Sequence, residues 1–266
     1  MPVIDAHAHI YPDKISAKAV SAVGRFYGVE HKMEGKGTVS DLLSHRETSD
    51  VTHFLVHSVA TTPHSVTTIN SFIAEQCELH PEFIGFGTMH QDFEDMEAEV
   101  DRAIELGLHG FKLHPDTQMV NMDDPRLMRV YEIAQDLHLP LIIHCGDYRY
   151  DYSHPRRLKR ILHEFPDLVV DAAHFGGWSI QDWALEFLED ERCFLDMSSS
   201  MHSLGPRRTR ELVLAYGTDR ILFGSDFPMW EPADELRKFT SLGFSDAQLE
   251  DMCWHNAERF LGMKIG

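Results

Sequence analysis

Short apolar segments alternate with longer amphipathic segments along this chain. Most of the apolar segments are nearly continuous in hydrophobic residues, which is typical of parallel strands buried on both faces. We therefore expect eight strands: Val3–Ile10, Thr52–Val59, Phe83–Met89, Gly110–His114, Leu141–Cys145, Leu168–His174, Cys193–Ser198 and Ile221–Asp226.

The segments between these strands are expected to form helices, because their apolar residues follow helical spacing and their ends carry helix-stop signals. The clearest are an acidic segment with an apolar stripe from Met96 to Ile104 that ends at Gly107, the segments Asp124–His138 and Pro155–Phe165 that stop before prolines, and a last helix opened by a Ser245–Gln248 capping box and closed by Gly262.

Eight strand–helix alternations within 266 residues predict an α/β fold, a (β/α)₈ TIM barrel that spans residues 1–266 as a single domain. An open doubly wound sheet fits less well, because the sequence has neither a GxGxxG loop nor a P-loop after a strand. The segment Tyr11–Gly37 is longer than a usual connection between strand and helix. We expect it to form a lid over the mouth of the barrel.

Composition narrows the classes of partner. The formal net charge is −19, from 24 Lys and Arg against 43 Asp and Glu, and such a chain repels the phosphates of nucleic acid. No apolar run is long enough to span a membrane, and the N-terminus does not resemble a signal peptide. Four scattered cysteines favour reduced thiols in a cytoplasmic protein. We expect a small-molecule substrate, and a homodimer as the common default.

Residues that can bind a metal lie at the ends of several predicted strands. Side chains alternate along a strand, so His7 and His9 share one face and can reach one ion. The fifth, sixth and eighth strands end in His144, His174 and Asp226. One such residue alone is more often a hydrogen-bonded structural group. Because catalytic groups of these barrels lie at the C-terminal ends of strands, their occurrence together predicts a metal site.

This arrangement resembles the amidohydrolase superfamily, and in detail its amidohydrolase-2 branch, which includes proteins like aminocarboxymuconate-semialdehyde decarboxylase. Supporting runs are Gly110–Pro115, Ala173–Gly177, Phe223–Pro228 and Asn256–Gly262. The resemblance implies that His7, His9, His144 and Asp226 hold a metal and that His174 is catalytic or binds a second metal. Asp226 would then accept a proton from an activated water and deliver it to the leaving group.

Lys112 and His114 share one face of the fourth strand and are expected at the barrel mouth. Some members of the superfamily carry a carboxylated lysine there that bridges two metals, so Lys112, His114 and His174 are candidates for a second metal or for substrate binding. The alternative is that Lys112 is an ordinary amine that pairs with a carboxylate or contacts an anionic substrate.

Further polar and aromatic residues follow the strands and are weaker candidates for substrate binding. Each also has an ordinary structural interpretation: a satisfied histidine, a salt bridge within a loop, or an aromatic ring packed under a loop. These residues are His57, His90, Tyr148, Arg149, Trp178 and Trp230.

The predicted function is a metal-dependent hydrolase for a small substrate that carries a carboxylate. The alternative is a non-oxidative decarboxylase that uses the same ligands, and a barrel that binds metal without catalysis is a third interpretation. Three imidazoles and one carboxylate suit zinc, although manganese, iron or cobalt also fit such a site.

Overall fold

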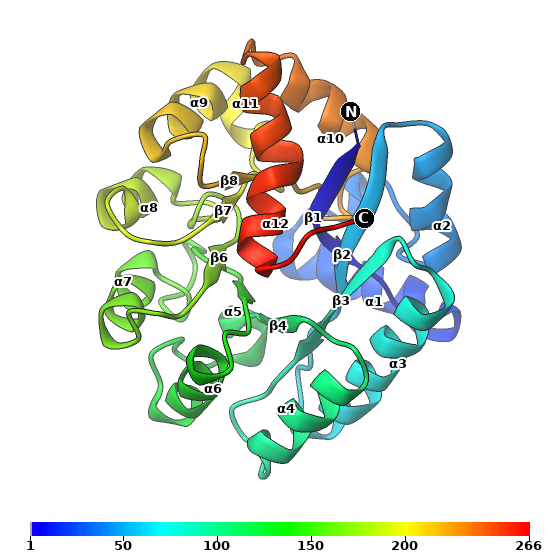
Figure 1. The fold of residues 1–266 in the computed structure, drawn as a ribbon, viewed down its shortest axis with the longest axis vertical. Coiled ribbons are helices and arrows are strands. Elements are labelled where there is room, and N and C mark those ends of the chain that lie inside the picture. The colour runs from blue at the N-terminus through cyan, green and yellow to red at the C-terminus, as the bar shows by residue number, and fades with distance from the viewer. Residues whose placement is uncertain (1) are drawn as a thin grey trace.

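Eight parallel strands form a barrel surrounded by helices in the computed structural model, which describes residues 2–266 (Figure 1). The first six strands make one sheet in chain order, and the last two pair with each other. The strands are β1 Val3–His9, β2 Val51–His57, β3 Phe83–Thr88, β4 Gly110–Leu113, β5 Leu141–Ile143, β6 Val170–Ala172, β7 Leu195–Asp196 and β8 Ile221–Leu222.

Two bridges join these sheets into a closed barrel. Asp171 of β6 pairs with Phe194 before β7, and Ala8 of β1 pairs with Phe227 after β8, both in parallel. The backbone N–H of Asp226 donates to the carbonyl of His7 at 2.8 Å across the second junction. The predicted (β/α)₈ fold is therefore confirmed, with every predicted strand in its place.

Helices surround the barrel in the positions that the amphipathic segments predict. They are α1 Asp13–Tyr27, α2 Val39–Ser44, α3 Val66–Leu79, α4 Met96–Glu105, α5 Pro115–Gln118, α6 Pro125–Asp136, α7 Pro155–Glu164, α8 Gln181–Leu188, α9 Met201–Tyr216, α10 Pro232–Thr240, α11 Asp246–Glu250 and α12 Asn256–Leu261, with short turns η1 Glu30–Lys32, η2 His45–Glu47, η3 Pro63–Ser65 and η4 Asp251–His255. The predicted Ser245–Gln248 capping box is present. The last predicted helix is continuous except for the π turn η4.

One end of the barrel is closed by α12, which crosses in front of the strands in Figure 1. Phe260 of this helix stacks on Phe86 of β3 with ring centroids 5.9 Å apart. Ile4, Leu55 and Ile142 belong to the same buried cluster. Because this cluster fills the end at which the strands begin, the opposite end, where they finish, is left for a site.

Several strands are shorter than the sequence pattern predicts, mostly at the C-terminal end, and β6 and β7 also begin two residues later than predicted. His174 and Asp226 have φ values of 62° and 63°, in the left-handed region that non-glycine residues seldom adopt. Such a residue cannot continue a strand, so β6 and β8 stop before their functional side chains. These unusual conformations concentrate at functional sites.

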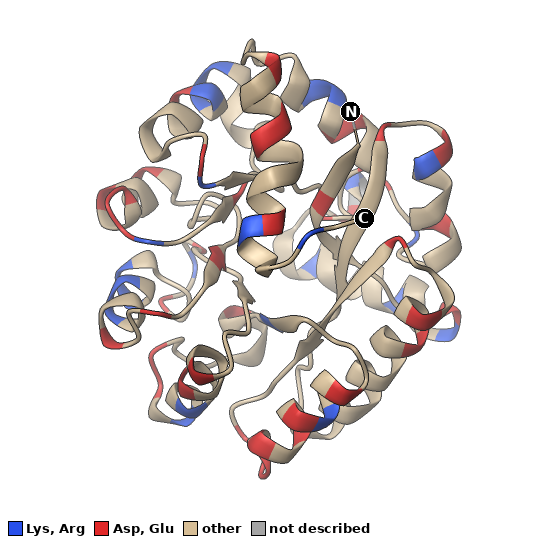
Figure 2. Ribbon diagram, in the orientation of Figure 1, with Lys and Arg blue, Asp and Glu red and all other residues tan. Residues whose placement is uncertain are grey.

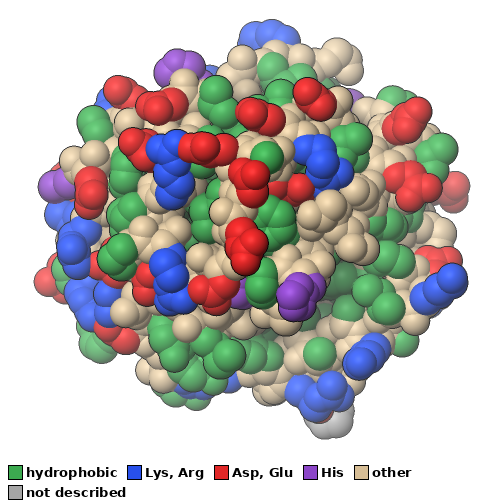
Figure 3. Space-filling model, turned by 90° about the horizontal axis from the view of Figure 1, so that it is seen from below, with side chains coloured by type: hydrophobic (Ala, Val, Ile, Leu, Met, Phe, Trp, Pro, Cys, Tyr) green, Lys and Arg blue, Asp and Glu red, His purple; other side chains and the backbone are tan. Residues whose placement is uncertain are grey.

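Charged side chains lie mostly on the outer helices, while the strands carry few (Figure 2). On the face shown in Figure 3, acidic side chains are interspersed with Lys and Arg. All four cysteines are unpaired, and three of them are buried. Within residues 2–266, no helix has the length and apolar character needed to cross a membrane.

Candidate metal centre

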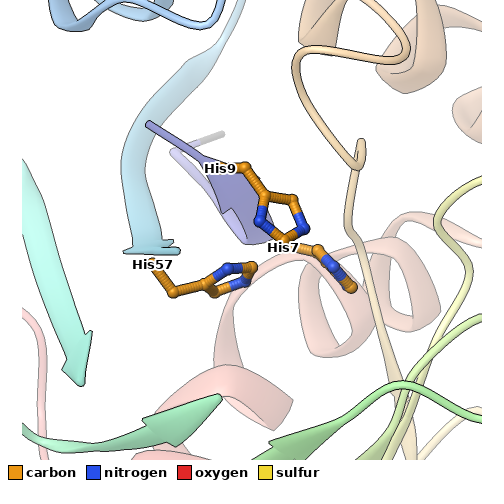
Figure 4. Close-up of side chains that lie close together, drawn as sticks. All are labelled: His7, His9 and His57. Carbon is orange, nitrogen blue, oxygen red and sulfur yellow. The ribbon is translucent and has the colours of Figure 1, made fainter. Parts of the chain in front are cut away.

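Three histidines from β1 and β2 meet at the C-terminal end of the barrel (Figure 4). His9 and His57 are partners in the parallel register of the two strands, and their ring centroids lie 4.4 Å apart. His7 and His9 project from the same face of β1, as predicted from their spacing. One ligand nitrogen from each of the three rings lies within 4.8 Å of the other two, a spacing that one ion can bridge.

Asp226 faces this group from the end of β8. Its Oδ1 lies 3.6 Å from His7 Nε2 and 3.5 Å from His9 Nε2. Two ligands bound to one zinc at about 2.1 Å in tetrahedral geometry are separated by roughly 3.4 Å. Each of these two distances therefore fits a pair of ligands on one small divalent ion.

The proton on His7 is fixed by Asp196 at the end of β7. Nδ1 of His7 donates to Oδ2 of Asp196 at 2.7 Å, and both side chains are buried. The lone pair of the imidazole is therefore on Nε2, the nitrogen that faces Asp226, and this is the tautomer that a metal ligand needs. The sequence analysis missed Asp196, although it lies in the predicted strand Cys193–Ser198 near the end at which catalytic groups collect.

Lys112 is the buried cation of the site. Its Nζ donates to His7 Nε2 at 3.0 Å, so it lies on the lone pair that a metal would use. Burial lowers the pKa of Lys112, while the nearby carboxylates of Asp196 and Asp226 raise it. This position fits both interpretations of the sequence analysis, a contact for an anionic group and a residue beside a metal.

His144 and His174 lie beside these residues and are joined to them by hydrogen bonds. The hydroxyl of Ser198 donates to Asp196, so Nδ1 of His174 is left to donate to the carbonyl of Ser198 at 3.0 Å. Nε2 of His174 then accepts from Nδ1 of His144 at 3.1 Å. This series of hydrogen bonds leaves the lone pair of His144 on Nε2. That atom is buried and has no hydrogen-bond partner among the described residues.

His144 does not stand in the same ligand group as His7 and His9. It stacks on His114 with centroids 3.9 Å apart, and its Nε2 faces Asp116 Oδ2 at 3.4 Å. Burial raises the pKa of Asp116 to about 6. His114, Asp116 and His144 form a separate candidate group, and ligation by His144 stays a prediction.

Burial favours the neutral form of His9, His57, His144 and His174. It is the largest cause that lowers the pKa of His9, His57 and His144 well below the usual value, and it lowers that of His174 to about 3. Neutral imidazole is the form that binds metal. These four imidazoles are therefore in the protonation state that a metal ligand needs.

A cavity of about 370 Å³ opens above these groups. Its floor contains His7, His9, Lys112, His114, His144, His174 and Asp226, and its walls come mainly from α1 and α3. Tyr27 at the end of α1 reaches this floor, where its hydroxyl lies 2.5 Å from His114 Nε2. The Tyr11–Gly37 segment therefore borders the cavity, as expected for a cover over the mouth.

The weaker candidates for substrate binding occupy other places. His57 is fully buried beside His7 and His9, and both of its ring nitrogens lack a partner within the described part of the chain. His90 is buried beside Asp92, and Tyr148 is 73% exposed. The structure does not place any of these three in the cavity lining.

Arg149, Trp178 and Trp230 support the site from outside the cavity. Arg149 pairs with Asp147 and lies over the ring of Phe26 in α1, and Trp178 packs on Tyr27 with centroids 4.6 Å apart. Both therefore hold α1 in place.

Nε1 of Trp230 donates to Ser199 Oγ at 2.9 Å, and Ser199 in turn donates to Asp226 Oδ2. Trp230 thus orients the carboxylate of Asp226 without lining the pocket.

A closed barrel with histidines and aspartates clustered at the C-terminal end of its strands is a TIM barrel with candidate metal ligands where such enzymes have their active site. Residues 4–263 match the model of a family described as amidohydrolase. The chain belongs to this family and is an enzyme of the amidohydrolase superfamily, as the sequence motifs predict.

Solved structures share the fold over nearly the whole length. An uncharacterized TIM-barrel protein from Bordetella bronchiseptica has 18% identity and a TM-score of 0.79, with 98% of this chain and 99% of that chain covered. A 5-carboxyvanillate decarboxylase from Sphingomonas paucimobilis has 16% identity and a TM-score of 0.76, with 99% of each chain covered. A dihydroxybenzoic acid decarboxylase from a Polaromonas species, solved with manganese and an inhibitor, has 16% identity and a TM-score of 0.73, with coverage of 98% and 97%.

Proposed function

We propose that the protein is a metal-dependent hydrolase that acts on a small substrate carrying a carboxylate. The observation that carries this proposal is the position of Asp226 Oδ1, which lies 3.6 Å from His7 Nε2 and 3.5 Å from His9 Nε2, distances typical of two ligands on one ion. His144, with its unpartnered Nε2, would supply the fourth ligand. A bound divalent ion would polarise the substrate and lower the pKa of water to about 7. Zinc suits this donor set best, and manganese is the metal of one similar structure.

Asp226 is the group suited to move the proton. One oxygen faces the two histidines, and the other accepts from Ser199. Burial raises the pKa of Asp226, which brings this carboxylate closer to the pKa that a general base needs near neutral pH. In our proposal, Asp226 takes a proton from the attacking water and returns it to the leaving group.

Lys112 and His174 are suited to hold the substrate. The Lys112 ammonium lies in the floor of the cavity and would bind a carboxylate or a developing oxyanion. His174 also lines the cavity, and its ring is fixed by Ser198. It would orient the water or polarise a substrate oxygen. Lys112, His114 and His174 remain the candidates for a second metal.

Decarboxylation at the same site is the second candidate, because two of the similar structures above are decarboxylases. In that reaction Asp226 or His174 would deliver the proton that replaces CO₂. Turnover of a panel of lactones, amides and aromatic or enolic carboxylic acids in H₂¹⁸O distinguishes the two. Label in the product supports hydrolysis, whereas release of CO₂ without label supports decarboxylation. The absence of turnover after zinc and manganese loading would contradict both and favour a barrel without catalysis.

The remaining expectations are part of this proposal. A cytoplasmic location agrees with four unpaired cysteines. A single domain over residues 1–266 and a homodimer stay predictions, and size-exclusion chromatography with light scattering tests the dimer.

A further inference from the structure

The helix that borders the cavity carries an apolar stripe with no core to pack against. Ile15, Ala19, Ala22, Val23 and Phe26 of α1 all line the cavity, and their spacing places them on one helical face. Such a stripe normally packs into a hydrophobic core. In the described part of the chain, none of these five residues belongs to either buried core cluster.

A second stripe lies on α3. Thr68, Ile69 and Phe72 of α3 line the same cavity at helical spacing, and Ile69 and Phe72 are only partly buried against the core. The polar floor with Lys112 and Asp226 belongs to this same cavity. The space is therefore polar at one end and apolar along its walls.

Positive charge is confined to one end of this space. Among the described residues that line the cavity, Lys112 is the single lysine and none is an arginine. The nearby Arg149 is paired with Asp147 and lies outside the lining. A second carboxylate on the substrate would therefore enter an apolar environment without a partner, which is costly.

We propose that the apolar stripes of α1 and α3 bind the apolar body of the substrate, and that the substrate is an amphiphilic monocarboxylate rather than a dicarboxylate. This inference rests on the proposed function, since it takes the polar floor as the reacting end. The carboxylate lies near Lys112, and the alkyl or aryl body extends between the helices. Removing this body from water supplies binding energy in proportion to the apolar area buried.

Calorimetric titration of the zinc-loaded protein with butanoate, hexanoate and octanoate tests the inference without turnover. We expect affinity to rise roughly two- to fourfold for each added methylene. Suberate, which has the chain length of octanoate and a second carboxylate, is expected to bind at least tenfold more weakly than octanoate. Equal affinity along the series, tighter binding of suberate, or no binding of any of these acids would overturn the inference.

Matched variants place the binding on α1. Ile15 and Ile104 are helical isoleucines with 51% and 41% exposure, but only Ile15 lines the cavity. Ile15→Asp should weaken octanoate binding several-fold and leave butanoate binding unchanged, whereas Ile104→Asp should alter neither. Ala19→Phe, which narrows the cavity, should also weaken octanoate selectively. Equal effects of Ile15→Asp and Ile104→Asp would contradict the assignment.

The two proposals fail separately. If the chain-length series behaves as expected and the turnover panel yields no product, the substrate class stands and the hydrolase proposal fails. If a panel compound is hydrolysed while monocarboxylates show no gain with length, the apolar-body inference fails and the hydrolase proposal stands.

Discussion

Nδ1 of His7 donates to Oδ2 of Asp196 at 2.7 Å, in a contact between the first and seventh strands of the barrel. Both side chains are buried, so solvent does not compete for the proton. The contact sets the tautomer of His7, a predicted metal ligand. It also holds a second buried carboxylate, that of Asp196, near Asp226. Partners of this kind orient the ring and increase its basicity.

Asp196→Asn is expected to lower metal affinity about 10- to 100-fold, because the amide is a weaker acceptor and can present its NH₂ to His7. Competition with a chelator measures this change. Asp182→Asn is the control, since Asp182 is 80% exposed on α8. An unchanged affinity in a folded Asp196→Asn protein would contradict the role assigned to this contact.

Asp226→Asn is expected to reduce turnover of any substrate identified on the panel by about 10²- to 10⁴-fold, because the amide cannot carry the proton. Its metal content should fall less than that of His7→Ala, because the amide oxygen can still act as a ligand. Steady-state kinetics and metal analysis of the same samples measure both effects. Equal loss of metal in the two variants would show only that Asp226 is a ligand.

His144→Gln is expected to lower metal affinity more than His57→Gln does. His144 lines the cavity, whereas His57 is fully buried and outside the lining despite its proximity to His7 and His9. Metal titration of the two variants compares them directly. A larger loss of metal affinity in His57→Gln would indicate that His57, and not His144, is the ligand.

Glu258→Gln is expected to reduce stability at neutral pH, and the loss should shrink as the solution becomes acidic. Hydrogen bonds, first that from Lys264, lower the pKa of Glu258 from 4.5 to about 2. A depressed pKa in the folded state stabilises the protein above the unfolded value, and this contribution is lost as pH falls from about 4.5 to about 2. Lys264 is 83% exposed, so screening limits the effect to about 1 kcal/mol or less. Denaturation midpoints of both proteins at pH 7 and pH 3 should differ more at pH 7, and an equal difference at both pH values would refute this linkage.

The fold and the ends of the strands were predictable because the signal is local. A continuous apolar segment marks a strand buried on both faces, and the residue that follows it lies at the mouth of the barrel. His7, His9 and Asp226 were found in this way, and the structure brings them together.

The contacts made by barrel closure were not predictable. Asp196 meets His7 only because β7 and β1 come close around the ring, and no spacing in the sequence encodes that contact. His57 shows the same limit, because the sequence placed it near the mouth but did not show that its register with His9 brings it beside the two histidines of β1. The spacing of apolar residues in α1 predicts one apolar helix face. The same spacing does not distinguish a face that packs on a core from one that lines a cavity.

The central claim is that His7, His9 and Asp226 hold a divalent ion. Metal analysis by inductively coupled plasma mass spectrometry of the purified protein, alongside His9→Ala, tests it most directly. We predict about one zinc or manganese per chain in the wild-type protein and a large loss in a His9→Ala protein that remains folded. A folded wild-type protein that retains no divalent metal and does not take up added zinc would contradict the claim.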